Sequence, residues 1–176
     1  DCLLSRGLGD VYKRQRRLKS SISSTSAPAR RNCAEPPMKR EFAGTCPKES
    51  QEPESNEDQS AFAEDCSRFA LCDGASESYN SRLWAKMLAE KFAANPAFGP
   101  KWLAEALRDY IAGHDFEAMT WSQHAGFDRG SFSTLLGVEF DSERRTVDVL
   151  AIGDCVAVLV DGCLLYTSPS PRDKRQ

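Results

Sequence analysis

The stretch Arg68-Phe-Ala-Leu-Cys-Asp-Gly74 constrains the fold of this chain more than any other. It is a short apolar run that ends in Asp73-Gly74 and continues into small polar residues. Such a run predicts a buried β-strand with a carboxylate where the strand ends. Asp-Gly ends many strands simply because it turns well, so the pair alone indicates little. A glycine also lets the backbone approach an ion closely, and hard cations prefer oxygen ligands. Asp73 and Gly74 therefore predict a metal site if other carboxylates lie beside them.

The two ends of the chain carry a different signal. Residues 11–15 read Val-Tyr-Lys-Arg-Gln, which corresponds to the translation of a transposon-type sequencing adapter. Residues 163–173 can be encoded by the reverse complement of the same DNA. We therefore expect residues 1–15 and 163–176 to be adapter-derived artefacts, and the natural segment to run from residue 16 to residue 162, interrupted on both sides.

The charge is distributed unevenly over the remaining segment. Residues 16–40 hold seven basic residues and one acidic residue, with many Ser and Pro, and too few apolar residues to offset the entropy of ordering. We predict a disordered linker there; an arm for nucleic acid or an acidic membrane is the alternative. Residues 41–162 hold ten basic and 22 acidic residues, which argues against a nucleic-acid partner and suits a domain that gathers carboxylates around metal.

The cysteines show no sign of a zinc site or a disulfide framework. Five of the seven lie between the adapter segments, without paired spacing and without histidine at zinc spacing: Cys33, Cys46, Cys66, Cys72 and Cys155. We expect reduced thiols and a cytoplasmic protein. No apolar run approaches the roughly 20 residues of a membrane span, and no signal peptide is recognisable, so no membrane partner is expected. The oligomeric state stays open.

The hydrophobic pattern of residues 41–162 predicts an α+β fold. Short strands are expected at 60–64 and 68–72, amphipathic helices at 79–94 and 100–111, and further strands at 131–140, 146–152 and 155–160. Residues 116–124 are a candidate third helix, and residues 126–130 are a predicted loop. Two strands, two helices and then strands in hairpin order are typical of helices packed on antiparallel sheets.

Four short motifs follow one another along this segment. They are Asn56-Glu57-Asp58, the apolar strand that ends in Asp73-Gly74, the stretch Gly130-Ser-Phe-Ser-Thr-Leu-Leu136, and Gly153-Asp154 after a second apolar run. In this order the chain resembles the metal-dependent protein phosphatases of the 2C type, especially the compact bacterial members. The resemblance implies a four-layer α/β/β/α sandwich, of which residues 41–162 would be the N-terminal part.

The resemblance also implies a site and a reaction. Asp73 would bridge two Mg²⁺ or Mn²⁺ ions, the Gly74 carbonyl would bind one of them, Glu57 and Asp58 would bind metal directly or through water, and Asp154 would serve a further, weaker ion. Asp73 and Asp58 would be the catalytic residues, because two ions ready a bridging water for in-line attack on phosphorus. The implied activity is hydrolysis of phosphoserine or phosphothreonine on a phosphoprotein substrate. It requires that Asp58 and Asp73 lie close together on one face of the sheet.

Three features depart from the family pattern. Pro53 stands where many members have an arginine that clamps phosphate, and Lys48 of the same loop is a candidate to replace it. Ala75 stands where some members have a histidine. The remaining metal aspartates would follow residue 162, so we expect this chain to bind metal weakly and to be inactive alone. These departures motivate an alternative function, a phosphatase-like module that binds a phosphoprotein or another partner without hydrolysis.

Overall fold

The computed structural model describes residues 16–21, 40–47, 51–52, 55–161 and 164–167. Five antiparallel strands form the main sheet in the order β1-β5-β4-β3-β2. They are β1 (Arg16–Ser21), β2 (Asp58–Phe62), β3 (Arg68–Asp73), β4 (Leu135–Asp141) and β5 (Thr146–Ile152). A separate pair joins β6 (Val158–Asp161) to β7 (Leu164–Thr167).

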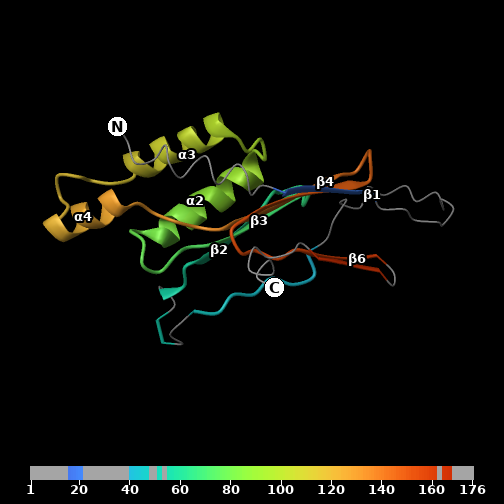
Figure 1. Ribbon diagram of the computed structural model, residues 1–176, viewed down its shortest axis with the longest axis horizontal. Coiled ribbons are helices and arrows are strands. Elements are labelled where there is room, and N and C mark those ends of the chain that lie inside the picture. Colours follow the sequence, from blue (N-terminus) through green and yellow to red (C-terminus); the bar gives the residue numbers. More distant parts are fainter. Residues whose placement is uncertain (1–15, 22–39, 48–50, 53–54, 162–163, 168–176) are drawn as a thin grey trace, which may run out of the picture.

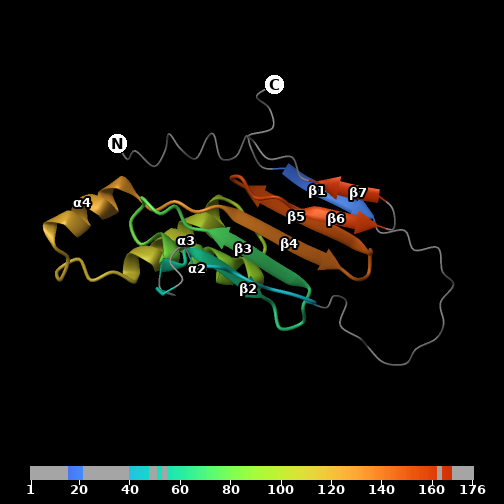
Figure 2. The same cartoon turned by 90° about the horizontal axis from the view of Figure 1, so that it is seen from below.

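Helix α2 (Ser81–Ala94) covers one face of the main sheet. Helices α3 (Pro100–Ala112) and α4 (Trp121–Arg129) lie on the same side of the sheet (Figure 1). Helix α2 packs on β2, β3 and β4, and α3 packs on α2. Strand β6 lies on the opposite side of the sheet from these helices (Figure 1). Figure 2 shows β6 and β7 in front of the β1 and β5 end of the sheet.

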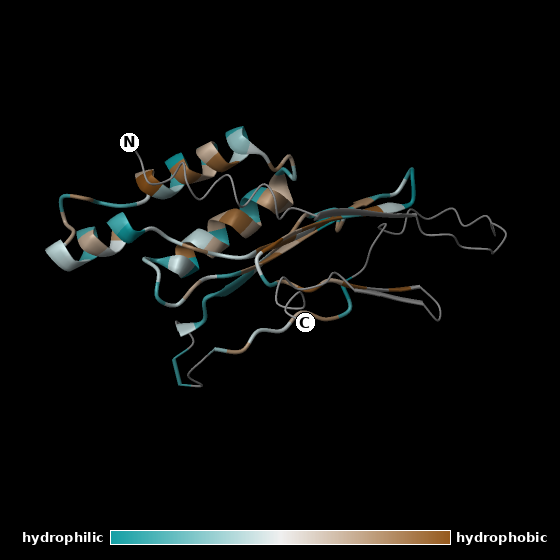
Figure 3. Cartoon of the chain, in the orientation of Figure 1, coloured by the Kyte–Doolittle hydropathy of each residue, from teal (hydrophilic) through white to brown (hydrophobic). Residues whose placement is uncertain are grey.

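The core lies between α2 and the central strands. Apolar residues of α2 at helical spacing are buried there, namely Trp84, Ala85, Leu88, Ala89 and Phe92. They meet Ala70 and Cys72 of β3, both 0 % exposed. Gly137 of β4 admits the Phe92 ring, since a Cβ built on Gly137 would stand 2.3 Å from it. Figure 3 shows hydrophobic positions gathered where α2 and the central strands meet.

An aromatic cluster joins the second and third helices to the loop before α2. The cluster consists of the rings of Tyr79, Tyr110, His114 and Phe127, and the centroids of contacting rings lie 4.5 to 6.2 Å apart. The Tyr110 hydroxyl donates to the Tyr79 carbonyl at 3.0 Å and lies 2.6 Å from the Ser131 hydroxyl. Burial raises the pKa of Tyr110. Through Tyr110, this network ties the loop before α2 to Ser131, which lies between α4 and β4.

The third helix begins and ends later than predicted. The candidate helix at 116–124 and the loop at 126–130 are both wrong in extent, because α4 spans Trp121–Arg129. The reason is a capping box: the Thr120 side chain accepts from the Gln123 N–H, and the Gln123 side chain accepts from the Thr120 N–H at 2.7 Å. Gly130, with φ of 91°, ends the helix.

The other elements lie near their predicted positions, with shifted bounds. The helices predicted at 79–94 and 100–111 are confirmed as α2 and α3, and the strand at 146–152 is confirmed as β5. Strand β2 begins two residues earlier than predicted. Strand β4 begins at Leu135 and not at residue 131, because residues 131–134 bond to the end of β3 and the loop after it. Strand β6 begins at Val158 and not at residue 155.

Two strands lie where the sequence predicted none. Residues 16–21 of the predicted linker form β1, which pairs with β5 from Arg16↔Ala151 to Ser21↔Thr146. Residues 164–167, within the predicted adapter segment, form β7. Residues 22–39, the rest of the linker apart from Arg40, lie outside the described part of the chain. The predicted α+β class is confirmed at this level. Among the described residues, no helix is long and apolar enough to cross a membrane.

Candidate metal centre

The β2–β3 hairpin places two predicted ligands opposite each other. Asp58 and Asp73 are direct partners in the antiparallel register. Side chains of such partners project from the same face of a sheet, with Cβ atoms about 4.5–5.5 Å apart. Along β3, Ala70 and Cys72 are buried under α2, whereas Leu71 and Asp73 are exposed. Both carboxylates therefore lie on the face that points away from the helices.

The backbone around Asp73 is held by the segment before β4. The Asp73 N–H donates to the Thr134 hydroxyl oxygen at 3.0 Å, and the Thr134 N–H donates to the Asp73 carbonyl at 2.9 Å. One residue further on, Gly74 forms an isolated antiparallel bridge with Ser133. The end of β3 is thus fixed by main-chain contacts and one threonine hydroxyl, all supplied by the Gly130–Leu136 motif.

A third carboxylate approaches from the turn after β5. Gly153 has a φ of 92°, which favours glycine, and it is followed by Asp154. Asp154 lines a hollow of about 230 Å³ together with Asp58 and Asp73. The other lining residues are Gly44, Thr45, Leu71, Thr134, Leu136, Cys155 and Val156. The structure therefore brings three of the predicted metal ligands to one hollow.

Two thiols near the end of β3 are held in their neutral form, chiefly by burial. Burial raises the pKa of Cys155, a hydrogen bond with the Thr134 side chain opposes the shift, and the charges of Asp154 and Asp73 add to it. Burial also raises the pKa of Cys72 to about 12, with a smaller contribution from Cys155. Both thiols are therefore protonated at neutral pH, and neither is an activated nucleophile.

The two other predicted metal ligands lie differently. Glu57 directly precedes strand β2, and its Oε1 accepts from the Ser81 hydroxyl at 2.9 Å, at the buried start of α2. Glu57 is not among the residues that line the hollow. Gly74 is buried, and a Cβ there would stand 2.8 Å from the Ser81 carbonyl oxygen. Gly74 is therefore needed for the packing of α2, whatever its carbonyl binds. Lys48 and Pro53 lie outside the described residues.

The donors at the hollow suit a hard cation. Asp58, Asp73 and Asp154 offer carboxylate oxygens, the ligands that Mg²⁺ and Mn²⁺ prefer. Like charges directly opposite each other on neighbouring strands are destabilising, and a cation between them removes that cost. Within the described ranges, however, no group of three or more His, Cys, Asp or Glu side chains is arranged closely enough to hold a metal ion. The three carboxylates share a hollow without forming a closed ligand set.

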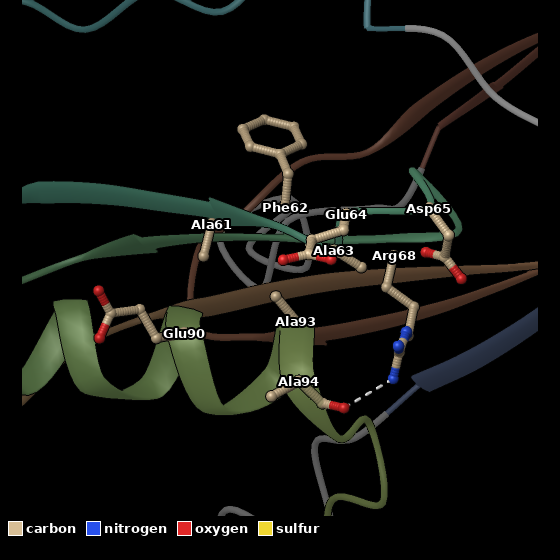
Figure 4. A pocket seen from close by; sticks show the side chains of 9 residues that line it. All are labelled: Ala61, Phe62, Ala63, Glu64, Asp65, Arg68, Glu90, Ala93 and Ala94. Carbon is tan, nitrogen blue, oxygen red and sulfur yellow. Dashed lines mark hydrogen bonds between the residues drawn. The ribbon is translucent and has the colours of Figure 1, made fainter. Parts of the chain in front are cut away.

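A second hollow, of about 520 Å³, lies at the other end of β2 and β3. Figure 4 shows its lining, with Ala61 and Ala93 between Glu64, Asp65 and Glu90, and with Arg68 bonded to the Ala94 carbonyl at 2.8 Å. Although larger, it holds none of the predicted ligands. We place the candidate site at the Asp58–Asp73 end.

Two residues that line the hollow, Thr134 and Cys155, were not among the predicted site residues. Thr134 was noted only as part of a motif, and Cys155 only as a thiol outside any pair. The sequence signal that could have indicated Thr134 is its place in the Gly130–Leu136 motif, directly before strand β4. No local signal indicated its contact with Asp73, which lies 61 positions earlier in the chain.

Comparison with known proteins identifies no relative: no family model, no curated protein and no solved structure matches this chain.

Proposed function

We propose that this chain carries part of the metal centre of a phosphatase that hydrolyses phosphoserine or phosphothreonine on proteins. The observation that supports it most is the direct pairing of Asp58 with Asp73 on the open face of the sheet, with Asp154 in the same hollow. The order of the four motifs, which resembles the 2C-type phosphatases, supports the same conclusion. We include in this proposal the four-layer α/β/β/α sandwich that the resemblance implies for the whole domain.

In this proposal each side chain has a defined task. Asp73 and Asp58 hold Mg²⁺ or Mn²⁺ from two neighbouring strands, and Asp154 adds a carboxylate from the β5 turn. Two bound ions supply an activated water and neutralise the phosphoryl oxygens. Leu71, Leu136 and Val156 line the hollow beside these carboxylates.

The test compares wild type with Asp73→Asn, which keeps the size of the side chain and removes its charge. Mn²⁺ binding is followed by electron paramagnetic resonance of the free ion. We expect weak binding by the wild type, with a dissociation constant on the order of 10⁻⁴–10⁻³ M, and at least tenfold weaker binding by the variant. Asp128→Asn, on the exposed surface of α4, is the matched control and should bind as the wild type does.

Phosphate release from a phosphothreonine peptide is measured on the same samples, and on the uninterrupted reading frame. We expect Mn²⁺-dependent release from the longer protein and its loss in Asp73→Asn. Equal Mn²⁺ affinity of wild type and Asp73→Asn would contradict the proposal.

The alternative is a module that binds a phosphoprotein without hydrolysing it. Pro53 favours it, because proline cannot supply the charge with which an arginine would clamp phosphate. The same samples separate the two functions. A binding module would retain the phosphopeptide without releasing phosphate, and Asp73→Asn would leave that retention unchanged.

A further inference from the structure

We propose that Thr134 is the positioning residue of the candidate metal centre, holding Asp73 and the Asp154 turn in a fixed relation to each other. This inference rests on the proposed function, because it concerns how the ligands of the same hollow are arranged. It assigns separate tasks to the hydroxyl and to the methyl group of one side chain.

Thr134 holds the backbone of Asp73. Thr134 bonds to both peptide groups that flank the Asp73 Cα: its Oγ1 accepts the Asp73 N–H at 3.0 Å, and its N–H donates to the Asp73 carbonyl at 2.9 Å. Fixing both peptide planes fixes the direction of the Cα–Cβ bond between them. The direction in which the Asp73 side chain leaves the backbone thus depends on a residue of another segment.

Thr134 also packs against the turn after β5. A Cβ built on Gly153 would stand 2.8 Å from Cγ2 of Thr134, so the backbone of the turn lies directly against this methyl group. Gly153 directly precedes Asp154 in the sequence. Thr134 therefore contacts both segments that bring carboxylates to the hollow.

The Thr134 side chain is stiff. A β-branched residue has few allowed rotamers, so the hydroxyl and the methyl group keep a fixed relation to each other. Thr134 itself lines the hollow that holds Asp58, Asp73 and Asp154. Loss of the hydroxyl would remove the bond to the Asp73 N–H and leave the bond to the Asp73 carbonyl, whereas loss of the methyl group would loosen the turn.

Two substitutions separate these contributions. Thr134→Val keeps the branched shape and removes the hydroxyl, whereas Thr134→Ser keeps the hydroxyl and removes the methyl group. Thr120→Val is the matched control, because it also removes one threonine hydroxyl that accepts a backbone N–H, at the start of α4. Mn²⁺ affinity and urea unfolding of the ion-free protein are measured for each variant.

We expect Thr134→Val to weaken Mn²⁺ binding about tenfold, and Thr134→Ser to stay within about threefold of wild type. Thr120→Val should lower stability and leave Mn²⁺ affinity unchanged. If Thr134→Val loses stability but binds Mn²⁺ as wild type does, Thr134 has only a structural role and the inference is wrong. If the wild type itself does not bind Mn²⁺, the proposed function fails first, and the inference fails with it.

Discussion

The two faces of strand β3 differ in packing and in chemistry. Along β3, Ala70 and Cys72 are fully buried under α2, whereas Leu71 is 45 % exposed and Asp73 is exposed on the other face. The helix side is packed with aromatic and aliphatic side chains, and the other side carries the three carboxylates. Stability and candidate chemistry are therefore separable by substitution, residue by residue, along the same strands.

The largest expected effect compares one leucine on each face. Leu88 of α2 is 5 % exposed in the core, so Leu88→Ala should lower the free energy of unfolding by about 2–5 kcal/mol through lost burial and a cavity. Leu71→Ala, on the open face, should cost less than about 1 kcal/mol. Urea unfolding measures both. Equal losses would mean that the open face is as well packed as the helix face.

A smaller effect compares one glycine on each face. Gly137→Ala would set a methyl group against the buried Phe92 ring, and Gly153→Ala would set one against Thr134 with an unfavourable φ of 92°. Each should destabilise the fold by about 1–3 kcal/mol. Only Gly153→Ala should also weaken Mn²⁺ binding. A loss of Mn²⁺ affinity in Gly137→Ala would show that the two faces are coupled.

The smallest expected effect is the dependence of stability on alkaline pH. Burial raises the pKa of Cys72 to about 12, against an ordinary value of 9.0, so the folded state keeps a proton that the unfolded state loses. Its contribution to stability is complete below pH 9 and falls as the pH rises toward 12. Unfolding free energy should fall by roughly 1 kcal/mol between pH 8.5 and pH 10.

Cys72→Ala tests this assignment. The variant should be less stable at pH 7 because it leaves a small cavity, but its stability should fall less steeply with alkaline pH. A slope identical to that of the wild type would assign the pH dependence to other groups.

Local patterns predicted the parts of the fold that depend on nearby residues. The spacing of Trp84, Leu88 and Phe92 predicted α2, and the apolar run that ends at Asp73 predicted β3. The extent of α4 was missed because a capping box outweighs a weak hydrophobic stripe. Strand β1 was missed because its residues are mostly polar, and it exists through pairing with β5, over a hundred positions away.

The candidate site was predicted in part for the same reason. Motif order indicated Asp58, Asp73 and Asp154, and these share one hollow. The direction of Glu57 could not be predicted, because it depends on the Ser81 hydroxyl at the start of α2. Thr134 was missed because its partners come from two other segments that only the folded sheet brings together.

The tight turn between β2 and β3 has a consequence for how this gene can vary. Asp65 accepts from both the N–H and the hydroxyl of Ser67, and Cys66 adopts a φ of 55°, so the turn length sets which residues of the two strands pair. Adding one codon there would shift the pairing by one residue and send one carboxylate toward α2. An insertion or deletion in the β2–β3 turn is therefore expected to weaken ion binding as much as replacing Asp58 or Asp73, although it alters neither carboxylate.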